Sequence, residues 1–224
     1  MGERLVPMLL PYAGRMRRGP GTIVALLTAG VLAAVILALA LGGSGGRRAA
    51  VASSPSLGAG FAGAALPPGQ TVHDFTLADQ RGRQVSLASL RGRVVVLTFL
   101  YSSCGAACVV IAQQIRGALD DLARPVPVLI VSADPAGDTR ERIARFLREV
   151  SLSGRVSYLS GPLPRLRSLW SAYRVTPASA GRGAFDLHAS VLLLDRTGAE
   201  RVIFQQEQLT PESLAHDIGR LEGG

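Results

Sequence analysis

The apolar positions of the chain form three consecutive patterns: one long uncharged run, one segment of small residues, and a stretch of short apolar runs separated by polar turns. Residues 22–41 form the uncharged run, and its length matches the roughly 20 residues that a helix needs to cross a bilayer. More arginines precede this run than follow it, so the positive-inside rule places the N-terminus in the cytoplasm. A cleaved signal peptide is the alternative, because Ala38-Leu39-Ala40 has the small-x-small form of a cleavage site.

These patterns predict four parts of the chain. Residues 1–21 form a basic cytoplasmic segment, residues 22–42 a transmembrane anchor, and residues 43–68 a flexible linker rich in Gly, Ala, Ser and Pro. Residues 69–224 form one folded domain, since this length suffices for a single well-packed core. The domain is therefore expected outside the cytoplasm, held at the cell membrane by a single-pass anchor.

Within the domain, runs with the period of a strand alternate with runs that have the period of a helix. The expected elements, in chain order, are a hairpin over residues 75–87, a strand at 94–100, a helix over 105–123, a strand at 128–131, a helix from 138 or 139 to 150, a strand at 156–159, a helix through 166–173, a hairpin over 191–204 and a C-terminal helix from 210. A βαβ unit followed by a hairpin and a helix predicts the α/β class, as a thioredoxin-like sandwich with a central mixed β-sheet flanked by helices.

Cys104 and Cys108 are the only cysteines in the chain, and they form a CxxxC motif directly after the strand expected at residues 94–100. If this motif opens the next helix, both sulfurs lie on one side of the first turn, because positions i and i+4 are neighbours. Unpaired N–H groups and the positive end of the helix dipole favour a thiolate there. The pair is a candidate for a redox disulfide or for two ligands of one soft metal ion. Two buried structural cysteines are the simpler alternative.

The charge of the chain does not indicate a nucleic-acid-binding protein. The formal net charge is +8, but the first 64 residues carry six Arg against one Glu. From residue 65 onward there are 18 Arg against 15 acidic residues, so the folded domain has only a small excess of positive charge. All basic residues are Arg, which we attribute to a GC-rich genome and not to a binding surface.

Three smaller features complete the prediction. His73 and His216 have no ligand-like neighbours in the sequence and are expected at the surface. Residues 134–139 (DPAGDT) are expected to form a turn and a helix cap, with a supporting role beside a metal as the alternative. Trp170 and Tyr173 are expected to pack a helix against the sheet.

Four stretches, in this order and at this spacing, resemble the SCO/SenC family of membrane-anchored copper proteins. They are residues 74–87 (DFTLADQRGRQVSL), 94–108 (VVVLTFLYSSCGAAC), 131–139 (VSADPAGDT) and 186–198 (DLHASVLLLDRTG). The resemblance, over about residues 66–222, implies that Cys104, Cys108 and His188 bind one copper ion. It further implies an extracytoplasmic metallochaperone that aids assembly of the copper centre of cytochrome c oxidase.

Two functions remain open at this stage. As a metallochaperone the protein holds Cu(I) or Cu(II) and passes it to an oxidase subunit, and it is not an enzyme in the strict sense. As a membrane-tethered thiol-disulfide oxidoreductase it needs no metal, because Cys104 attacks a disulfide of another thiol redox protein and Cys108 resolves the mixed disulfide. A peroxidase function is disfavoured, since no Pro and Thr precede Cys104 at the spacing of that family. A tethered interaction domain with a purely structural disulfide is a last alternative.

The sequence departs from the family pattern at two places. The family usually has proline after each cysteine, where this chain has Gly105 and Val109. The histidine is one residue closer than usual to the following glycine turn, so an ungapped match places Leu187 at the ligand position. In a loop before the strand His188 can reach the cysteines, whereas within regular strand the one-residue shift turns it to the opposite face.

Overall fold

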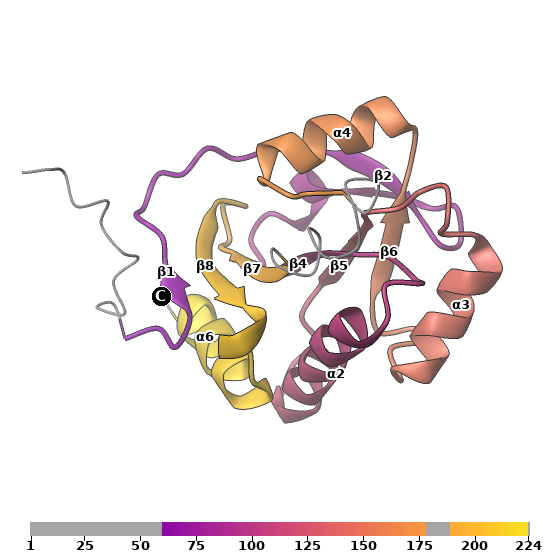
Figure 1. Ribbon diagram of the computed structural model, residues 1–224. Coiled ribbons are helices and arrows are strands. Elements are labelled where there is room, and N and C mark those ends of the chain that lie inside the picture. Colours follow the sequence, from indigo (N-terminus) through magenta and orange to yellow (C-terminus); the bar gives the residue numbers. More distant parts are fainter. Residues whose placement is uncertain (1–59, 178–188, 224) are drawn as a thin grey trace, which may run out of the picture. The chain divides into compact units, whose positions relative to one another are not determined.

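One mixed β-sheet forms the centre of the domain in the part of the chain that the computed structural model describes, residues 60–177 and 189–223. Its eight strands follow the order β1-β8-β7-β4-β5-β6-β2-β3 (Figure 1). The strands are β1 (Ala64–Ala65), β2 (Thr76–Asp79), β3 (Gln84–Ser86), β4 (Val95–Leu100), β5 (Val128–Ser132), β6 (Ser157–Ser160), β7 (Ser190–Leu194) and β8 (Glu200–Gln205). The helices are α2 (Ala106–Asp121), α3 (Arg140–Glu149), α4 (Leu163–Ala172) and α6 (Pro211–Gly223), with short 3-10 segments η2 (Leu87–Leu90) and η4 (Gln206–Gln208). β4, β5 and β6 run parallel, and the other neighbours pair antiparallel.

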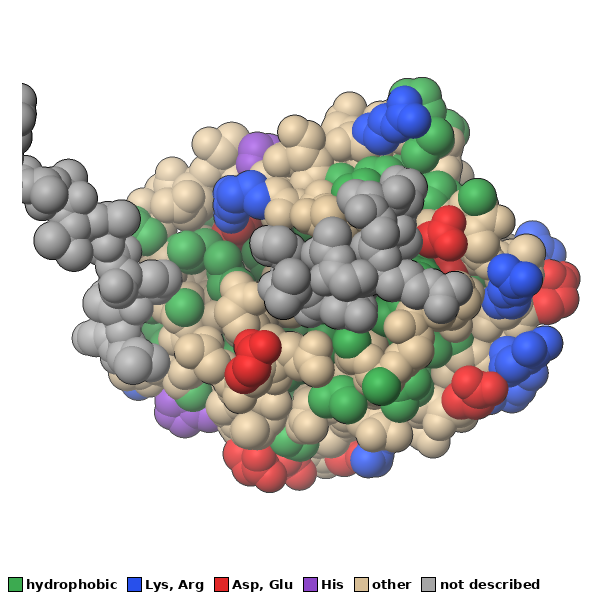
Figure 2. All heavy atoms as spheres, viewed as in Figure 1, with side chains coloured by type: hydrophobic (Ala, Val, Ile, Leu, Met, Phe, Trp, Pro, Cys, Tyr) green, Lys and Arg blue, Asp and Glu red, His purple; other side chains and the backbone are tan. Residues whose placement is uncertain are grey.

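Helices cover both faces of this sheet (Figure 1). α2, α3 and α6 share one hydrophobic cluster, to which they contribute Ile111, Phe146 and Ile218. α4 covers the other face, where Trp170 and Tyr173 are buried in a second cluster, as predicted. Acidic and basic side chains mix on the outer side of α3, and hydrophobic side chains are exposed over α2 (Figure 2). The arrangement is the thioredoxin-like α/β sandwich that the sequence predicts.

The central strand β4 shows why its sequence is apolar throughout. All of its residues are buried. Val96 and Leu100 belong to the cluster beneath α2, whereas Leu97 and Phe99 belong to the cluster beneath α4. Successive side chains of a strand point to opposite faces, so a strand covered on both faces has no polar side. The carboxyl end of β4 leads directly into the cysteine motif.

The other expected strands and helices in the described residues are confirmed, with small differences at their ends. The helix expected over residues 105–123 is α2, which ends before an extended Leu122. The second strand of the first hairpin ends at Ser86, and the chain continues as η2 instead of as strand. Leu87 is buried there and its N–H donates to the Phe75 carbonyl at 3.0 Å. Leu87, which was expected to end the strand, instead starts η2 with its side chain in the core.

The folded domain begins before the predicted boundary at residue 69. β1 pairs antiparallel with β8 at one edge of the sheet. The buried carboxylate of Asp217 in α6 accepts the N–H groups of Ala62 at 2.8 Å and of Gly63 at 2.9 Å. Residues 60–68 therefore belong to the edge of the domain and not to a flexible linker. A strand of two residues is too short to show a period in the sequence.

Replacing Asp217 by alanine is expected to lower the free energy of unfolding by about 2–3 kcal/mol, because two N–H groups at the domain edge lose their acceptor. Chemical denaturation followed by circular dichroism measures the change. Glu212→Ala, at an exposed position of the same helix, is the control and should change stability by less than about 0.5 kcal/mol. An equal, small effect of both substitutions would show that Asp217 does not hold this segment.

No helix within residues 60–177 and 189–223 combines the length and the apolar character of a membrane span. The predicted basic segment at residues 1–21, the predicted anchor at 22–42 and residues 43–59 of the predicted linker lie outside the described residues. His188 also lies outside them. Membrane anchoring and the third copper ligand accordingly stay predictions from the sequence.

Candidate functional site

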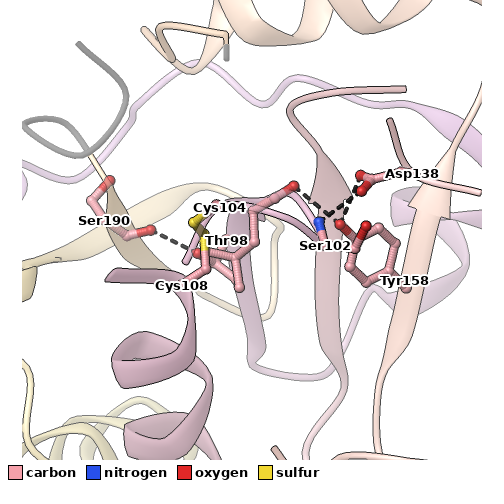
Figure 3. Close-up of a disulfide and its surroundings, with 8 residues drawn as sticks. Thr98, Ser102, Cys104, Cys108, Asp138, Tyr158 and Ser190 are labelled. Atoms are coloured by element: carbon pink, nitrogen blue, oxygen red, sulfur yellow. Dashed lines mark hydrogen bonds between the residues drawn. A yellow bond between two sulfur atoms is a disulfide. The ribbon is translucent and has the colours of Figure 1, made fainter. Parts of the chain in front are cut away.

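Cys104 and Cys108 form a disulfide at the start of α2, with their Cα atoms 5.9 Å apart (Figure 3). Cys108 lies in the first turn of the helix and is fully buried. Cys104 precedes the helix and is only half-buried. Thiol exchange depends on access to the sulfur that is attacked. The pair thus has one cysteine that a partner can reach and one that the core covers.

Gly105 links the two cysteines through a backbone conformation that suits only glycine. Its φ of 85° and ψ of −147° lie in a region that other residues hardly adopt. Proline, the residue expected here from the family pattern, has φ fixed near about −65°. The chain therefore enters α2 by a path that proline at this position would forbid.

The N-terminus of α2 favours negative charge beside the cysteines. No side chain caps this helix end, and its first turn contains no acidic residue. The first N–H groups of a helix have no acceptor within the helix, and the positive end of its dipole lies there. After reduction of the disulfide, this field stabilises a thiolate, which is the form that attacks disulfides and binds metals.

A buried carboxylate holds the loop that leads into the cysteine motif (Figure 3). Asp138 Oδ1 accepts the N–H of Ser102 at 2.7 Å. Asp138 Oδ2 accepts the hydroxyl groups of Ser132 at 2.5 Å and of Tyr158 at 2.8 Å. Ser132 ends β5 and Tyr158 lies in β6, so this carboxylate joins the loop to two central strands.

The Tyr158 hydroxyl donates to this carboxylate at 2.8 Å and also lies 3.3 Å from the Leu100 carbonyl. Burial raises the pKa of its hydroxyl well above the usual value, and the negative charge and hydrogen bond of Asp138 raise it further. At a pH above about 10 the unfolded chain ionises this tyrosine while the folded chain keeps its proton. The unfolded state then binds fewer protons, so the free energy of unfolding falls as the pH rises.

Tyr158→Phe is therefore expected to reduce the loss of stability between about pH 10 and pH 11.5. The free energy of unfolding, measured by urea denaturation at several pH values, should decline less steeply for this variant than for the wild type. Tyr173, whose pKa burial also raises, contributes to the decline that remains. Parallel curves for Tyr158→Phe and wild type would contradict the assignment.

β7 starts beside the carboxyl end of β4, next to the cysteine motif. The carbonyl of Ser190, the first residue of β7, accepts the hydroxyl of buried Thr98 at 2.9 Å (Figure 3). Ala189 is buried in the same hydrophobic cluster as Cys108. His188, the residue before Ala189, lies outside the described residues. The first described residues after this gap therefore lie at the carboxyl end of β4, where that strand leads to Cys104.

The other two histidines have partners of their own. His73 is half-buried and packs edge-on against Tyr173, with ring centroids 5.5 Å apart. His216 is exposed, as predicted, and its Nδ1 lies 2.8 Å from Asp217 Oδ1. Among the residues that the structure describes, no group of three or more His, Cys, Asp or Glu side chains is placed to hold a metal. The cysteine pair alone supplies soft donors in this part of the chain.

Sequence reasoning missed the inward position of Asp138. The helix cap expected at Asp138 or Thr139 is confirmed at Thr139, which accepts the N–H of Arg142 at 3.3 Å. The position of Asp138, shortly after a buried parallel strand, is the signal that could have revealed its role, because functional groups collect at that edge of an α/β sheet. Tyr158 gives a second signal, since a tyrosine within a buried strand needs a partner for its hydroxyl.

The folded domain is similar to known proteins. A family model described as SCO1/SenC matches residues 64–222. Protein SCO2 homolog, mitochondrial, from Bos taurus is 29% identical over 109 residues, which cover 46% of this chain. A protein from Mycobacterium tuberculosis that carries a peroxiredoxin name is 32% identical over 108 residues, which cover 48% of this chain. The chain spans 40% and 66% of the length of these two relatives.

A solved structure of ScoI from Bradyrhizobium japonicum with copper bound is similar in both fold and sequence. It matches with a TM-score of 0.51 and 27% identity, over 67% of this chain and 98% of that chain. The SCO1/SenC match begins at β1 and ends within α6, so it covers the same segment as the folded domain. The match to the protein with a peroxiredoxin name covers less than half of this chain.

Proposed function

The chain belongs to the SCO1/SenC family, and from this membership we propose that it binds copper outside the cytoplasm and aids assembly of the copper centre of cytochrome c oxidase. Cys104, Cys108 and His188 are the ligands, and copper is the cargo that the protein receives and hands on. Its partner is the oxidase subunit that carries a copper centre. Residues 22–42 anchor the protein to the cell membrane in a single pass, with the N-terminus in the cytoplasm.

The observation that carries this proposal is the pairing of Cys104 with Cys108 at the start of α2. Two cysteines that close a disulfide can, once reduced, present both sulfurs to one metal ion. Thiolate sulfur suits Cu(I), and an imidazole accommodates copper in either oxidation state. Zinc accepts the same ligand types, so the donor set fits copper without being unique to it. The copper-bound relative at 27% identity favours copper.

The described neighbours of His188 support it as the third ligand. Ala189 is buried with Cys108, and Ser190 is hydrogen-bonded to Thr98 in β4. β7 therefore begins at the end of the sheet that carries the cysteines. A histidine in a loop at this end can complete the site, even though it is one residue closer to the glycine turn than in the family pattern.

A second candidate function is thiol-disulfide exchange, which the unequal exposure of the two cysteines favours. The Cys104 thiolate attacks a disulfide of the partner, and one partner sulfur leaves as a thiolate. The Cys108 thiolate then attacks the mixed disulfide, so that the reduced partner is released and the Cys104–Cys108 disulfide forms. This function requires neither copper nor His188.

Titration of the reduced full-length protein with Cu(I), in the presence of a competing chelator, separates the two functions. Tight binding of a single copper ion, together with slow reduction of a disulfide substrate by the copper-free protein, is the expected result. Failure to bind copper, together with rapid reduction of that substrate, would overturn the copper proposal in favour of thiol-disulfide exchange.

A further inference from the structure

We propose that Asp138 is a positioning residue that stabilises the Cys104–Cys108 disulfide by anchoring the main chain of Ser102. The inference concerns the cysteine pair of the proposed function, but it requires no copper. Asp138 is 8% exposed and contacts neither sulfur in any hydrogen bond. Its effect on the pair must therefore pass through the loop that it holds.

The contacts of Asp138 make a rigid anchor. Oδ1 accepts the N–H of Ser102 at 2.7 Å, while Oδ2 is held by the hydroxyl groups of Ser132 and Tyr158. Ser132 is itself fixed from the other face of the sheet, because its carbonyl accepts the indole N–H of Trp170 at 3.1 Å. The carboxylate therefore holds the loop between β4 and α2 in a fixed position relative to β5 and β6.

Beyond Tyr101, whose side chain is buried in the same cluster as Cys108, the loop is held mainly by local contacts. The N–H of Cys104 donates to the Tyr101 carbonyl at 3.2 Å, which closes a local turn without tying it to the sheet. Ser103 and Gly105 are exposed, and Gly105 has the conformational freedom of glycine. Without the bond from Ser102 to Asp138, the main chain that carries Cys104 can move away from the helix that carries Cys108.

A disulfide is stabilised to the extent that the folded chain holds its two sulfurs together. In equilibrium with glutathione, the protein disulfide and two glutathione thiols give the protein dithiol and one glutathione disulfide, so electrons and protons balance. A more mobile loop lowers the effective concentration of the Cys104 sulfur near the Cys108 sulfur. The equilibrium then shifts toward the dithiol. Loss of the anchor should therefore shift this equilibrium toward the reduced protein.

Two substitutions separate the anchor from the negative charge. Asp138→Asn keeps an oxygen that can accept the Ser102 N–H, and its amide can donate to the hydroxyl groups of Ser132 and Tyr158, whose protons can rotate. Asp138→Ala removes both the anchor and the charge. Tyr158→Phe removes one bond to the carboxylate and leaves the anchor in place. Ser102→Pro removes the donor while Asp138 stays, and so reports on the anchor if Asp138→Ala does not fold.

The experiment equilibrates the copper-free full-length protein in detergent with mixtures of reduced and oxidised glutathione, traps free thiols by alkylation and determines the equilibrium constant. Asp138→Ala and Ser102→Pro should favour the dithiol by about tenfold, equivalent to about 30 mV. Asp138→Asn and Tyr158→Phe should stay within about twofold of the wild type. Asp217→Ala is expected to destabilise the domain where the segment before β1 is held, and it is the control for a merely structural effect.

Wild-type values for Asp138→Ala and Ser102→Pro would overturn the proposal. An equal shift for Asp138→Asn and Asp138→Ala would also overturn it, because the charge would then act and not the anchor. A shift for Asp217→Ala as large as that for Asp138→Ala would reduce the effect to general loss of stability. Because the assay contains no copper, these outcomes are independent of a failure of the wild type to bind copper.

Discussion

Replacing either Cys104 or Cys108 by serine should abolish tight copper binding. The affinity of the reduced protein for Cu(I) is expected to fall by more than about 100-fold, beyond the 10–100-fold that loss of a supporting partner costs at a metal site. A serine hydroxyl is a hard ligand that keeps its proton, whereas Cu(I) prefers a soft thiolate. Competition with a Cu(I) chelator measures the affinity.

Ser103→Ala is the matched control, since Ser103 is exposed and directly precedes Cys104. Its affinity for Cu(I) should equal that of the wild type. Retention of tight Cu(I) binding by Cys104→Ser or by Cys108→Ser would remove that cysteine from the site. The same variants lose thiol-disulfide exchange, so they test the cysteine pair under both candidate functions.

The two serine variants should differ in stability even when all proteins are compared in the reduced state. Cys108 is fully buried within the apolar cluster under α2, so a serine there places a hydroxyl without a partner in the core. This change costs about 1–3 kcal/mol. Cys104 is half-buried, and its hydroxyl counterpart can reach water. Greater stability of Cys108→Ser than of Cys104→Ser would contradict the burial order of the pair.

His188→Ala should weaken copper binding by about 100-fold and leave the glutathione equilibrium of the cysteines unchanged. The imidazole is a ligand in the proposed site, but it takes no part in thiol-disulfide exchange. Chelator competition and glutathione titration of the same protein measure the two properties. His73→Ala and His216→Ala are the controls, because both histidines contact other residues in the described structure.

The outcome for His188→Ala decides whether this histidine belongs to the copper site. Loss of copper affinity with an unchanged disulfide identifies the histidine as a ligand. An unchanged, tight copper affinity would remove His188 from the site and leave the two cysteines as the ligands that bind copper. Leu187, which an ungapped match places at the ligand position, has no donor atom and cannot substitute.

The central layer of the fold could be predicted from the sequence because both faces of its strands are covered. Val95, Leu97 and Phe99 face one cluster, and Val96 and Leu100 face the other, so β4 is an unbroken apolar run. Its carboxyl end leads directly to the cysteines, so their position at the start of α2 could be predicted. Helix α6 was also predictable, since Pro211 at its first position follows Thr210.

Features that depend on contacts between distant segments could not be predicted. β1 is held by β8 and by Asp217, which lies far along the chain in α6. Asp138 likewise has two partners far along the chain, Ser102 and Tyr158, and the local sequence favours a helix cap instead. The position of Asp138 after a buried strand indicates an inward role, but nothing in the local sequence names the distant loop that it holds.

X-ray absorption spectroscopy of the Cu(I)-loaded reduced protein tests the proposed copper site most directly. The spectrum should show two sulfur atoms and one imidazole nitrogen as nearest neighbours of copper, and His188→Ala should lose the nitrogen while it keeps both sulfurs. A spectrum with only oxygen and nitrogen neighbours would contradict the assignment of Cys104 and Cys108 as copper ligands.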